Sequence, residues 1–161
     1  MTVAPYMGKD SVGPFIERCA QGKGVYVLVR TSNAGARDLQ DLSVDGVPVY
    51  MKTAEKLVEW HAPGVGAVVG ATYPAELEKI SEFFVRSGKE VPLLIPGVGA
   101  QGGSAADVVA VLKKTKNPLW MHRINSSSGI TYAYEKEKSK DYVGAAVRAM
   151  KELVKESGLV F

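Results

Sequence analysis

The sequence contains very little cysteine or histidine and has no long hydrophobic run. Cys19 is the only cysteine in 161 residues, which excludes an internal disulfide, favours a reducing compartment and suggests a buried structural thiol. The two histidines, His61 and His122, lack metal-ligand spacing, so we expect no metal site. No run approaches the roughly 20 apolar residues of a membrane span, and no signal peptide opens the chain. These features favour a soluble, cytoplasmic protein without a cofactor.

A strong excess of one charge is also missing. The formal net charge is only +3 and the lysines are dispersed, which argues against nucleic-acid binding. Most lysines lie close to acidic residues, as in segments 76–79 and 151–156, and this pattern indicates solvated helix faces. With 46% hydrophobic and 23% charged residues, the composition is that of a globular protein, and the length fits a single domain over residues 1–161.

Apolar runs alternate with segments of helical periodicity. The expected strands are residues 24–29, 66–70, 91–95 and, more weakly, 119–125, while residues 2–6 hold the end of another strand. The expected helices are residues 11–22, 53–61, 72–88, 104–112 and 141–158, with Thr72, Ser104 and Asp141 as candidate caps. This alternation predicts an α/β fold with parallel strands and right-handed crossovers.

The chain length limits the architecture. Open doubly wound sheets and closed eight-stranded barrels both fit the alternation of strands and helices. A complete (β/α)₈ barrel needs about 250 residues, or about 31 for each βα unit. The 161 residues therefore supply about five units, and a barrel cannot close from this chain alone.

The stretch IPGVGAQGG, residues 95–103, has more glycine than a short connector needs. Ligands of parallel α/β folds bind where strands end, and a glycine-rich turn there lets backbone N–H groups approach an anion closely. The helix beginning near Ser104 would direct its positive end to the same place, and Gln101 could donate its amide to a phosphate oxygen. A wide structural turn without a ligand is the alternative.

Hydroxyl groups follow two other expected strands. The sequence RTSN occupies residues 30–33, and NSSSG occupies residues 125–129. Hydroxyl groups at strand ends more often cap backbone groups than contact ligands. Three polar strand ends that converge at one edge of a barrel nevertheless favour a phosphorylated small molecule as the ligand.

These segments resemble the second half of the orotidine 5′-phosphate decarboxylase family, in its longer bacterial-type subgroup. The end of the family's fourth strand and the following helix are matched by TVAPYMGKDSVGPF, and the fifth and sixth strands by VYVLVRTSNAGARDLQDL and GAVVGATYPAEL. The seventh and eighth strands are matched by LLIPGVGAQGG and INSSSGITYAY. The resemblance covers nearly the whole chain and implies a partial TIM (β/α)₈ barrel of about five βα units.

The resemblance also implies a pyrimidine nucleotide ligand. The substrate-binding residues that it implies are Ser32, Pro96, Gln101, Gly102 and Ser128. Pro96 and Gln101 match the loop that closes over the phosphate and base, and the glycines within residues 99–103 would let that loop hinge. Ser32 matches a hydroxyl that hydrogen-bonds the amide edge of the pyrimidine ring.

Ser128 marks a departure from the family pattern, because it stands where the family has a phosphate-binding arginine. Loss of a bidentate guanidinium removes a contact worth about 1.5–3 kcal/mol. Arg123, Lys136 or Lys138 could compensate, although none stands at the matching place.

The family's catalytic Asp-Lys-Asp-Asp network is a second departure. The network belongs to the second and third strands, which have no counterpart here, and the nearest lookalike, Lys9-Asp10, lies beyond the fourth strand. We therefore assign no catalytic residue and expect the isolated chain to be inactive in converting orotidine 5′-monophosphate (OMP) to uridine 5′-monophosphate (UMP) and CO₂. The first residue, Met1, just before the fourth strand's end, fits either a naturally split gene or a truncated sequence.

Three interpretations remain open. The first is a component of an orotidine 5′-phosphate decarboxylase in pyrimidine biosynthesis, completed by an N-terminal half-barrel partner chain that covers the open strand edges. The second is a non-catalytic nucleotide-binding protein, or a half-barrel that self-associates as a homo-oligomer. The third is a different phosphosugar enzyme on a similar barrel.

Overall fold

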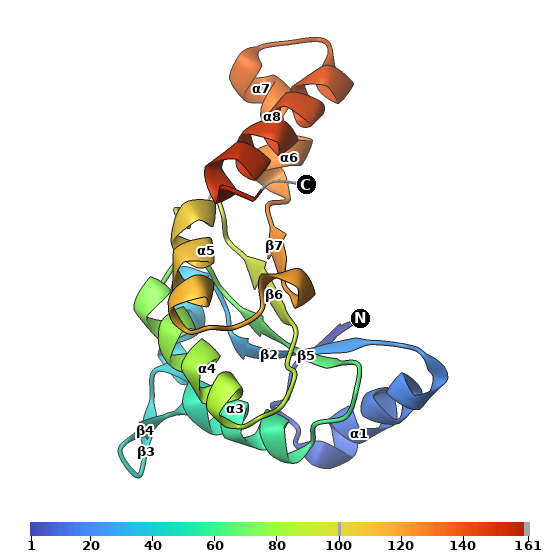
Figure 1. The fold of residues 1–161 in the computed structure, drawn as a ribbon, viewed down its shortest axis with the longest axis vertical. Helices are drawn as coiled ribbons and strands as arrows, with labels where there is room; N and C mark the ends of the chain where they lie inside the picture. Colours follow the sequence, from blue (N-terminus) through green and yellow to red (C-terminus); the bar gives the residue numbers. More distant parts are fainter. Residues whose placement is uncertain (100, 160–161) are drawn as a thin grey trace.

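The computed structural model describes residues 1–99 and 101–159, and its central feature in that part of the chain is a parallel sheet of five strands (Figure 1). The strands, in their spatial order, are β1 (Thr2–Val3), β2 (Val25–Arg30), β5 (Val65–Val69), β6 (Leu93–Pro96) and β7 (Arg123–Asn125). Every neighbouring pair is parallel. The predicted α/β class with parallel strands is confirmed.

Helices connect these strands. The crossovers contain α1 (Lys9–Glu17), η1 (Arg18–Gln21), α3 (Val49–Glu59), α4 (Pro74–Arg86), α5 (Ala105–Lys114) and η3 (Leu119–Met121). A longer connection after β2 adds η2 (Ala34–Ala36), α2 (Arg37–Gln40) and an antiparallel hairpin of β3 (Ser43–Val44) and β4 (Val47–Pro48). The chain after β7 forms α6 (Ser128–Thr131), α7 (Ala133–Glu137) and α8 (Tyr142–Ser157).

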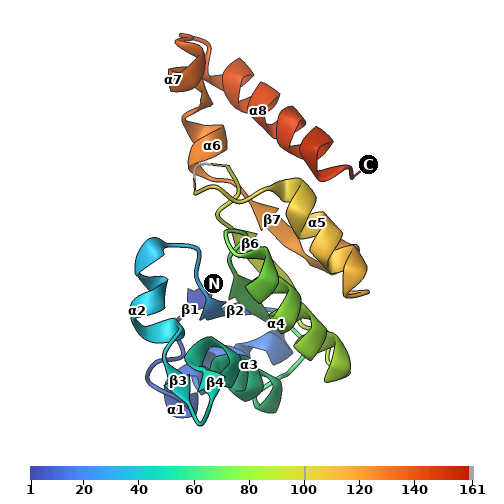
Figure 2. The same cartoon turned by 90° about the vertical axis from the view of Figure 1, so that its left-hand side faces the viewer.

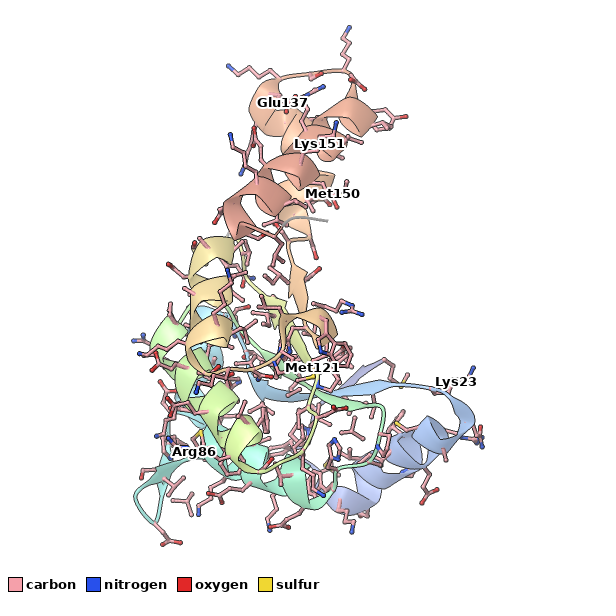
Figure 3. All side chains as sticks on the ribbon, in the orientation of Figure 1. Lys23, Arg86, Met121, Glu137, Met150 and Lys151 are labelled. Atoms are coloured by element: carbon pink, nitrogen blue, oxygen red, sulfur yellow. The ribbon has the colours of Figure 1, made fainter. Side chains whose placement is uncertain are left out.

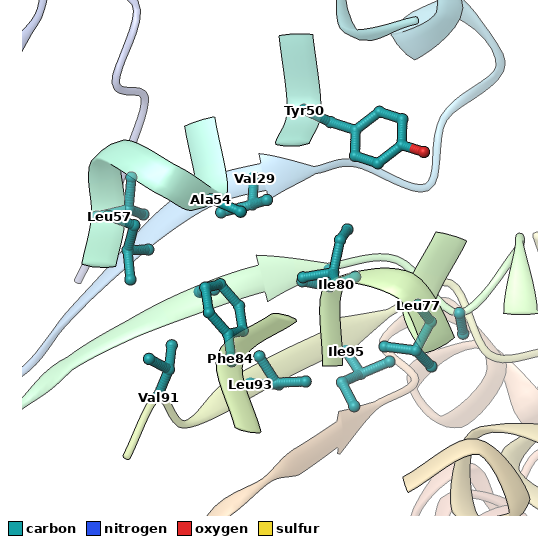
Figure 4. Close-up of a cluster of buried hydrophobic side chains, with 14 of the residues drawn as sticks. Val29, Tyr50, Ala54, Leu57, Leu77, Ile80, Phe84, Val91, Leu93 and Ile95 are labelled. Atoms are coloured by element: carbon teal, nitrogen blue, oxygen red, sulfur yellow. The ribbon is translucent and has the colours of Figure 1, made fainter. Parts of the chain in front are cut away.

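The hydrophobic core lies between one face of the sheet and the crossover helices (Figure 4). Side chains of α4, such as Ile80 and Phe84, point toward Leu93 and Ile95 of β6, and all four are buried. Alternate strand residues face opposite sides of a sheet, so Leu94 lies on the other face, where it is only half-buried. The sheet therefore has one well-packed face and one more open face.

Several expected helix boundaries are confirmed, and others shift. Ser104 accepts a hydrogen bond from the Asp107 backbone N–H (3.2 Å), and the Asp141 side chain caps α8 through the Gly144 N–H (2.8 Å). The expected helix 53–61 instead begins at Val49 and ends at Glu59. Cys19, in the expected helix 11–22, is buried as predicted.

The expected strand 119–125 is wrong over its first half. Residues Leu119–Met121 form a 3₁₀ turn, His122 is extended, and the strand itself spans only Arg123–Asn125. His122 explains the late start, because its Nδ1 accepts the backbone N–H of Leu93 (3.0 Å) at a point where a strand would offer a carbonyl. The His122 side chain thus supplies the acceptor that a backbone carbonyl would supply in the first hydrogen bond between β6 and β7.

The segment after β7 projects beyond the sheet (Figures 1 and 2). Figure 3 places Glu137, Met150 and Lys151 in this projecting part. The expected apolar stripe of α8 is only partly covered, since Val143, Val147 and Met150 are exposed. No helix in the described part of the chain combines the length and hydropathy needed to cross a membrane.

Candidate functional site

Polar groups from three neighbouring strand ends meet around Gly97, the residue after β6. A Cβ atom built on Gly97 would lie 2.7 Å from Ser32 Cβ and 3.1 Å from both Thr72 Oγ1 and Gln101 Oε1. Ser32 follows β2, Thr72 follows β5 and Gln101 follows β6. Two hydroxyls and one amide therefore converge at the carboxyl edge of the sheet, where parallel α/β folds bind ligands.

Each glycine of the turn after β6 occupies a position where the backbone angle or the surrounding space disfavours a side chain. Gly97, Gly99 and Gly102 have φ values of 98°, 82° and 85°, a region that favours glycine. A Cβ on Gly103 would lie 2.8 Å from the carbonyl oxygen of Gly97. The Gly99 N–H donates to the Gly103 carbonyl (2.9 Å), and the Gly103 N–H donates to the Gly97 carbonyl (3.0 Å). The turn is thus internally bonded, and its hinging stays a prediction.

The helix start after this turn already carries an acidic group. The backbone N–H of Ala105, the first residue of α5, donates to Glu156 Oε1 of α8 (2.9 Å). A carboxylate at this position suits the positive end of the helix. The phosphate that we expected near Ser104 would therefore have to compete with Glu156 for this donor.

Arg30, the last residue of β2 and the first of the RTSN segment, is only 1% exposed. Its Nη2 atom lies 3.1 Å from Asp41 Oδ1, and its Nε donates to Glu76 Oε2 in α4. Burial works to lower the pKa of Arg30, but the hydrogen bond and charge of Glu76, together with Asp41, outweigh it and raise that pKa. Arg30 is thus a paired structural cation rather than an open ligand contact.

The remaining predicted site residues lie in different settings. Pro96 is half-buried in the β6–β7 ladder, where it pairs with Asn125, and its carbonyl accepts the Ala71 N–H (2.8 Å). Gly102 is exposed in the glycine-rich turn. Ser128 is exposed at the first position of the four-residue helix α6.

Two site residues were missed at the level of sequence. Thr72 was interpreted as a helix cap, but α4 begins at Pro74 and the Thr72 hydroxyl donates to the Ser32 carbonyl (3.2 Å). Ser126 Oγ donates to the Val98 carbonyl (3.1 Å), so Ser126 joins the end of β7 to the glycine-rich turn. The hydroxyl-rich strand end at residues 125–129 already contains Ser126, and the same rule applied after β5 would have selected Thr72.

The cations proposed to compensate for the absent arginine are placed as follows. Arg123 Nη1 donates to the carbonyls of Trp120 (3.2 Å) and His122 (2.9 Å), at the start of β7. Lys136 lies in α7 and Lys138 is its C-cap residue. Within the described residues, no cluster of three or more His, Cys, Asp or Glu side chains could hold a metal ion.

A parallel sheet with helical crossovers defines a piece of a (β/α) barrel, and the polar cluster at its carboxyl edge is a candidate ligand site. Residues 1–142 match the model of the Orotidine 5'-phosphate decarboxylase / HUMPS family. The chain belongs to this family.

Curated relatives and solved structures agree with this membership. The orotidine 5'-phosphate decarboxylase of Halorubrum lacusprofundi is 43% identical over 163 residues, covering 96% of this chain and 57% of the relative. That of Cupriavidus metallidurans is 46% identical over 150 residues, with 91% and 50% covered. The structure of Leishmania donovani OMP decarboxylase matches with a TM-score of 0.69 and 30% identity over 98% of this chain and 57% of that one. The chain spans about half the length of the curated relatives it matches, so its sheet corresponds to about half of a TIM barrel.

Proposed function

We propose that this chain forms the phosphate- and pyrimidine-binding side of an orotidine 5′-phosphate decarboxylase, which converts OMP to UMP and CO₂. The observation that carries the proposal is the convergence of Ser32, Thr72 and Gln101 around Gly97. The Ser32 hydroxyl would hydrogen-bond the amide edge of the pyrimidine, and the Gln101 amide would donate to the phosphate. Pro96 and Gly102 would shape the loop between them, and Ser128 would face the phosphate end.

These residues would act through binding rather than through bond breaking. Loss of CO₂ without a cofactor leaves a carbanion, which must be stabilised by nearby positive charge and then protonated. By family resemblance, a lysine within an Asp-Lys-Asp-Asp network does this work, and that network would come from polypeptide outside these 161 residues. Contacts to the phosphate would supply remote binding energy that orients the pyrimidine against the lysine.

Exposed apolar side chains at both edges of the sheet support a second polypeptide. Tyr6 follows β1 and is 88% exposed, and Trp120 precedes β7 and is 72% exposed. A cavity of about 430 Å³ near β7 is lined by Leu119, Trp120 and Ile124, among others. A cavity of about 470 Å³ near β1 includes Tyr6 and Leu28. Open strand edges beside apolar hollows are surfaces that a protein normally covers, and the missing strands of a barrel would cover both.

A non-catalytic nucleotide-binding protein or a self-associating half-barrel is the second candidate. The contact between Glu156 and the Ala105 N–H favours the self-associating half-barrel, because this carboxylate uses a donor that a phosphate would need. The exposed Ser128, in place of an arginine, points the same way. Both features weaken phosphate binding without affecting the fold.

The test combines binding with complementation. UMP is titrated into the purified 161-residue chain by calorimetry, and OMP decarboxylation is then assayed with and without added polypeptide. The added polypeptide is the portion of the Cupriavidus metallidurans relative that this chain does not match. We expect UMP binding by the chain alone, and decarboxylation only in the mixture.

The control mixture contains Gln101→Ala, which should lower both UMP affinity and the rescued activity. UMP binding without rescue would support the non-catalytic alternative. Absence of both binding and rescue, or CO₂ release by the purified chain alone, would contradict the proposal.

A further inference from the structure

We infer that Gln40 is a positioning residue that holds the backbone beside Ser32 in the orientation needed to bind the pyrimidine. The inference rests on the proposed function, because it concerns the same site. It is carried by hydrogen bonds of Gln40, which lies at the end of α2 and eight residues beyond Ser32.

The Gln40 side chain binds Thr31 in both directions. The Thr31 backbone N–H donates to Gln40 Oε1 (2.9 Å), and Gln40 Nε2 donates to Thr31 Oγ1 (2.8 Å). One amide therefore satisfies both the main chain and the side chain of the residue that directly precedes Ser32. Such a reciprocal pair fixes the local backbone more firmly than a single hydrogen bond.

Gln40 is itself attached to the rigid part of the fold. Arg30 Nη1 donates to Gln40 Oε1 (3.2 Å), and the same guanidinium pairs with Glu76 of α4 and with Asp41. The Arg30 guanidinium also lies over the Tyr73 ring, 5.1 Å from its centroid. The amide of Gln40 thus links Thr31 to the buried Arg30 and, through it, to Glu76 and Asp41.

Ser32 is held on its other side by neighbouring strand ends. Its carbonyl accepts the Thr72 hydroxyl (3.2 Å), and its backbone fits against Gly70, where a Cβ would lie 2.8 Å from Ser32 Cα. Within residues 1–99 and 101–159, the Ser32 hydroxyl makes no hydrogen bond. The main chain is therefore fixed on both sides while the hydroxyl stays available to a ligand.

This arrangement has a thermodynamic consequence for binding. A loop that must become ordered when a ligand arrives loses affinity, whereas a loop that is already ordered does not. Removing the Gln40 amide would release Thr31 and let Ser32 sample other orientations. We expect Gln40→Ala to weaken UMP binding by about tenfold, the loss typical of one or two newly mobile groups.

The first experiment is calorimetric titration of UMP into the full 161-residue chain and its variants. Gln40→Glu is the conservative variant, since a carboxylate oxygen can still accept from the Thr31 N–H and from Arg30. Gln21→Ala is the matched control, because the Gln21 amide also accepts from an arginine, Arg18 (3.2 Å), on an exposed surface. We expect weaker binding for Gln40→Ala, substantial rescue in Gln40→Glu and unchanged binding for Gln21→Ala.

A merely structural role predicts a different pattern. Affinity would then follow the melting temperature of each variant, and Gln40→Glu would show no rescue beyond its stability. Unchanged UMP affinity in Gln40→Ala would also overturn the inference.

Amide hydrogen exchange separates this inference from the proposed function, because it needs no nucleotide. Gln40→Ala should speed exchange at the Thr31 N–H, while Gln21→Ala should not. Unchanged exchange at Thr31 overturns the positioning role. If the unaltered chain neither binds UMP nor supports decarboxylation in the mixture, the proposed function is overturned instead, whatever the exchange result.

Discussion

The ends of β2 and β7 both carry hydroxyl-rich segments, yet the structure builds them differently. The β2 end rests on Arg30, which is buried and paired with Asp41 and Glu76. The β7 end leads into the exposed Ser127 and Ser128 and the four-residue helix α6, whose N-cap has no side-chain hydrogen bond. The ion pairs of the buried Arg30 thus order the segment after β2. In the described residues of the segment after β7, no buried ion pair plays the same part.

This difference divides the proposed nucleotide site into two parts. The pyrimidine side, at Ser32, is ordered before a ligand binds, because Gln40 and Thr72 hold the surrounding backbone. The phosphate side, at Ser128, is exposed. A second polypeptide would therefore have more to contribute at the phosphate side than at the pyrimidine side.

The largest effect on stability should come from removing Arg30, whose ion pairs hold the end of β2. Arg30→Met removes the guanidinium that Glu76 and Asp41 share and, in the described part of the chain, leaves Asp41 only the exposed Arg37 as an ion-pair partner, so it should lower the free energy of unfolding by about 3–4 kcal/mol. Urea denaturation followed by tryptophan fluorescence measures the change. Arg37→Met is the matched control, because Arg37 is 61% exposed and should cost less than about 1 kcal/mol. Equal losses in the two variants would show that the buried cluster has no special role.

The next effect concerns Gly97, where the strand ends converge. Gly97→Ala combines an unfavourable φ of 98° with a Cβ only 2.7 Å from Ser32 Cβ, and should cost about 2–3 kcal/mol. Gly46→Ala is the control, since Gly46 has a φ of 76° but open space around its Cβ, and should cost about 1 kcal/mol. Thermal unfolding measures both, and UMP affinity should fall only in Gly97→Ala. A similar cost for both would mean that the contact with Ser32 relaxes easily.

His122 gives the start of β7 a pH-dependent anchor. Burial, and then the charge of Arg123, lowers the pKa of His122 from 6.5 to about 4, and among the described residues its buried Nε2 has no hydrogen-bond partner. Between these pH values the unfolded chain binds a proton that the folded chain does not. The contribution of His122 to the free energy of unfolding is therefore fully present above pH 6.5 and is lost as the pH falls toward 4. The loss between pH 7 and pH 5 is about 2 kcal/mol.

The His122 prediction is tested by urea denaturation at pH 7 and pH 5. His122→Asn can keep an acceptor near the Leu93 N–H but does not titrate, so its loss over this range should be smaller by about 2 kcal/mol. His61→Gln is the control and should keep the pH dependence of the unaltered chain. A pH dependence that survives in His122→Asn would assign it to other groups.

Local patterns predicted much of this fold from sequence. The apolar run 66–70 became β5, and Ser104 and Asp141 cap α5 and α8 as expected, because each signal lies within a few residues of its effect. The β3–β4 hairpin was missed, although Asp45-Gly46 at its turn is a known hairpin signal and both residues have positive φ.

The site was less predictable because its contacts are distant in sequence. Ser32 was selected through family resemblance and Gln101 first through the glycine-rich stretch, but their meeting with Thr72 depends on how three strands align. The pairing of Arg30 with Glu76 joins residues 46 positions apart, and no local pattern indicates it. His122 was dismissed as a metal ligand, and its bond to the Leu93 N–H could not be read from spacing.

The smallest expected effect comes from adding an arginine after β7, where the proposed site would bind the phosphate. Ser128→Arg places a guanidinium on the exposed position that the proposed site assigns to a phosphate-binding arginine, and should strengthen UMP binding by up to about tenfold. Ser128→Lys supplies charge without the bidentate geometry and should gain less. Ser127→Arg, at the adjacent exposed position, controls for a general increase in positive charge. Equal gains at both positions would reduce the effect to long-range attraction, and no gain at Ser128 would place the phosphate elsewhere. An increase in UMP affinity that is specific to Ser128→Arg would mean that the end of β7 keeps the geometry of a phosphate site. Only the arginine side chain that would contact the phosphate would then be lacking.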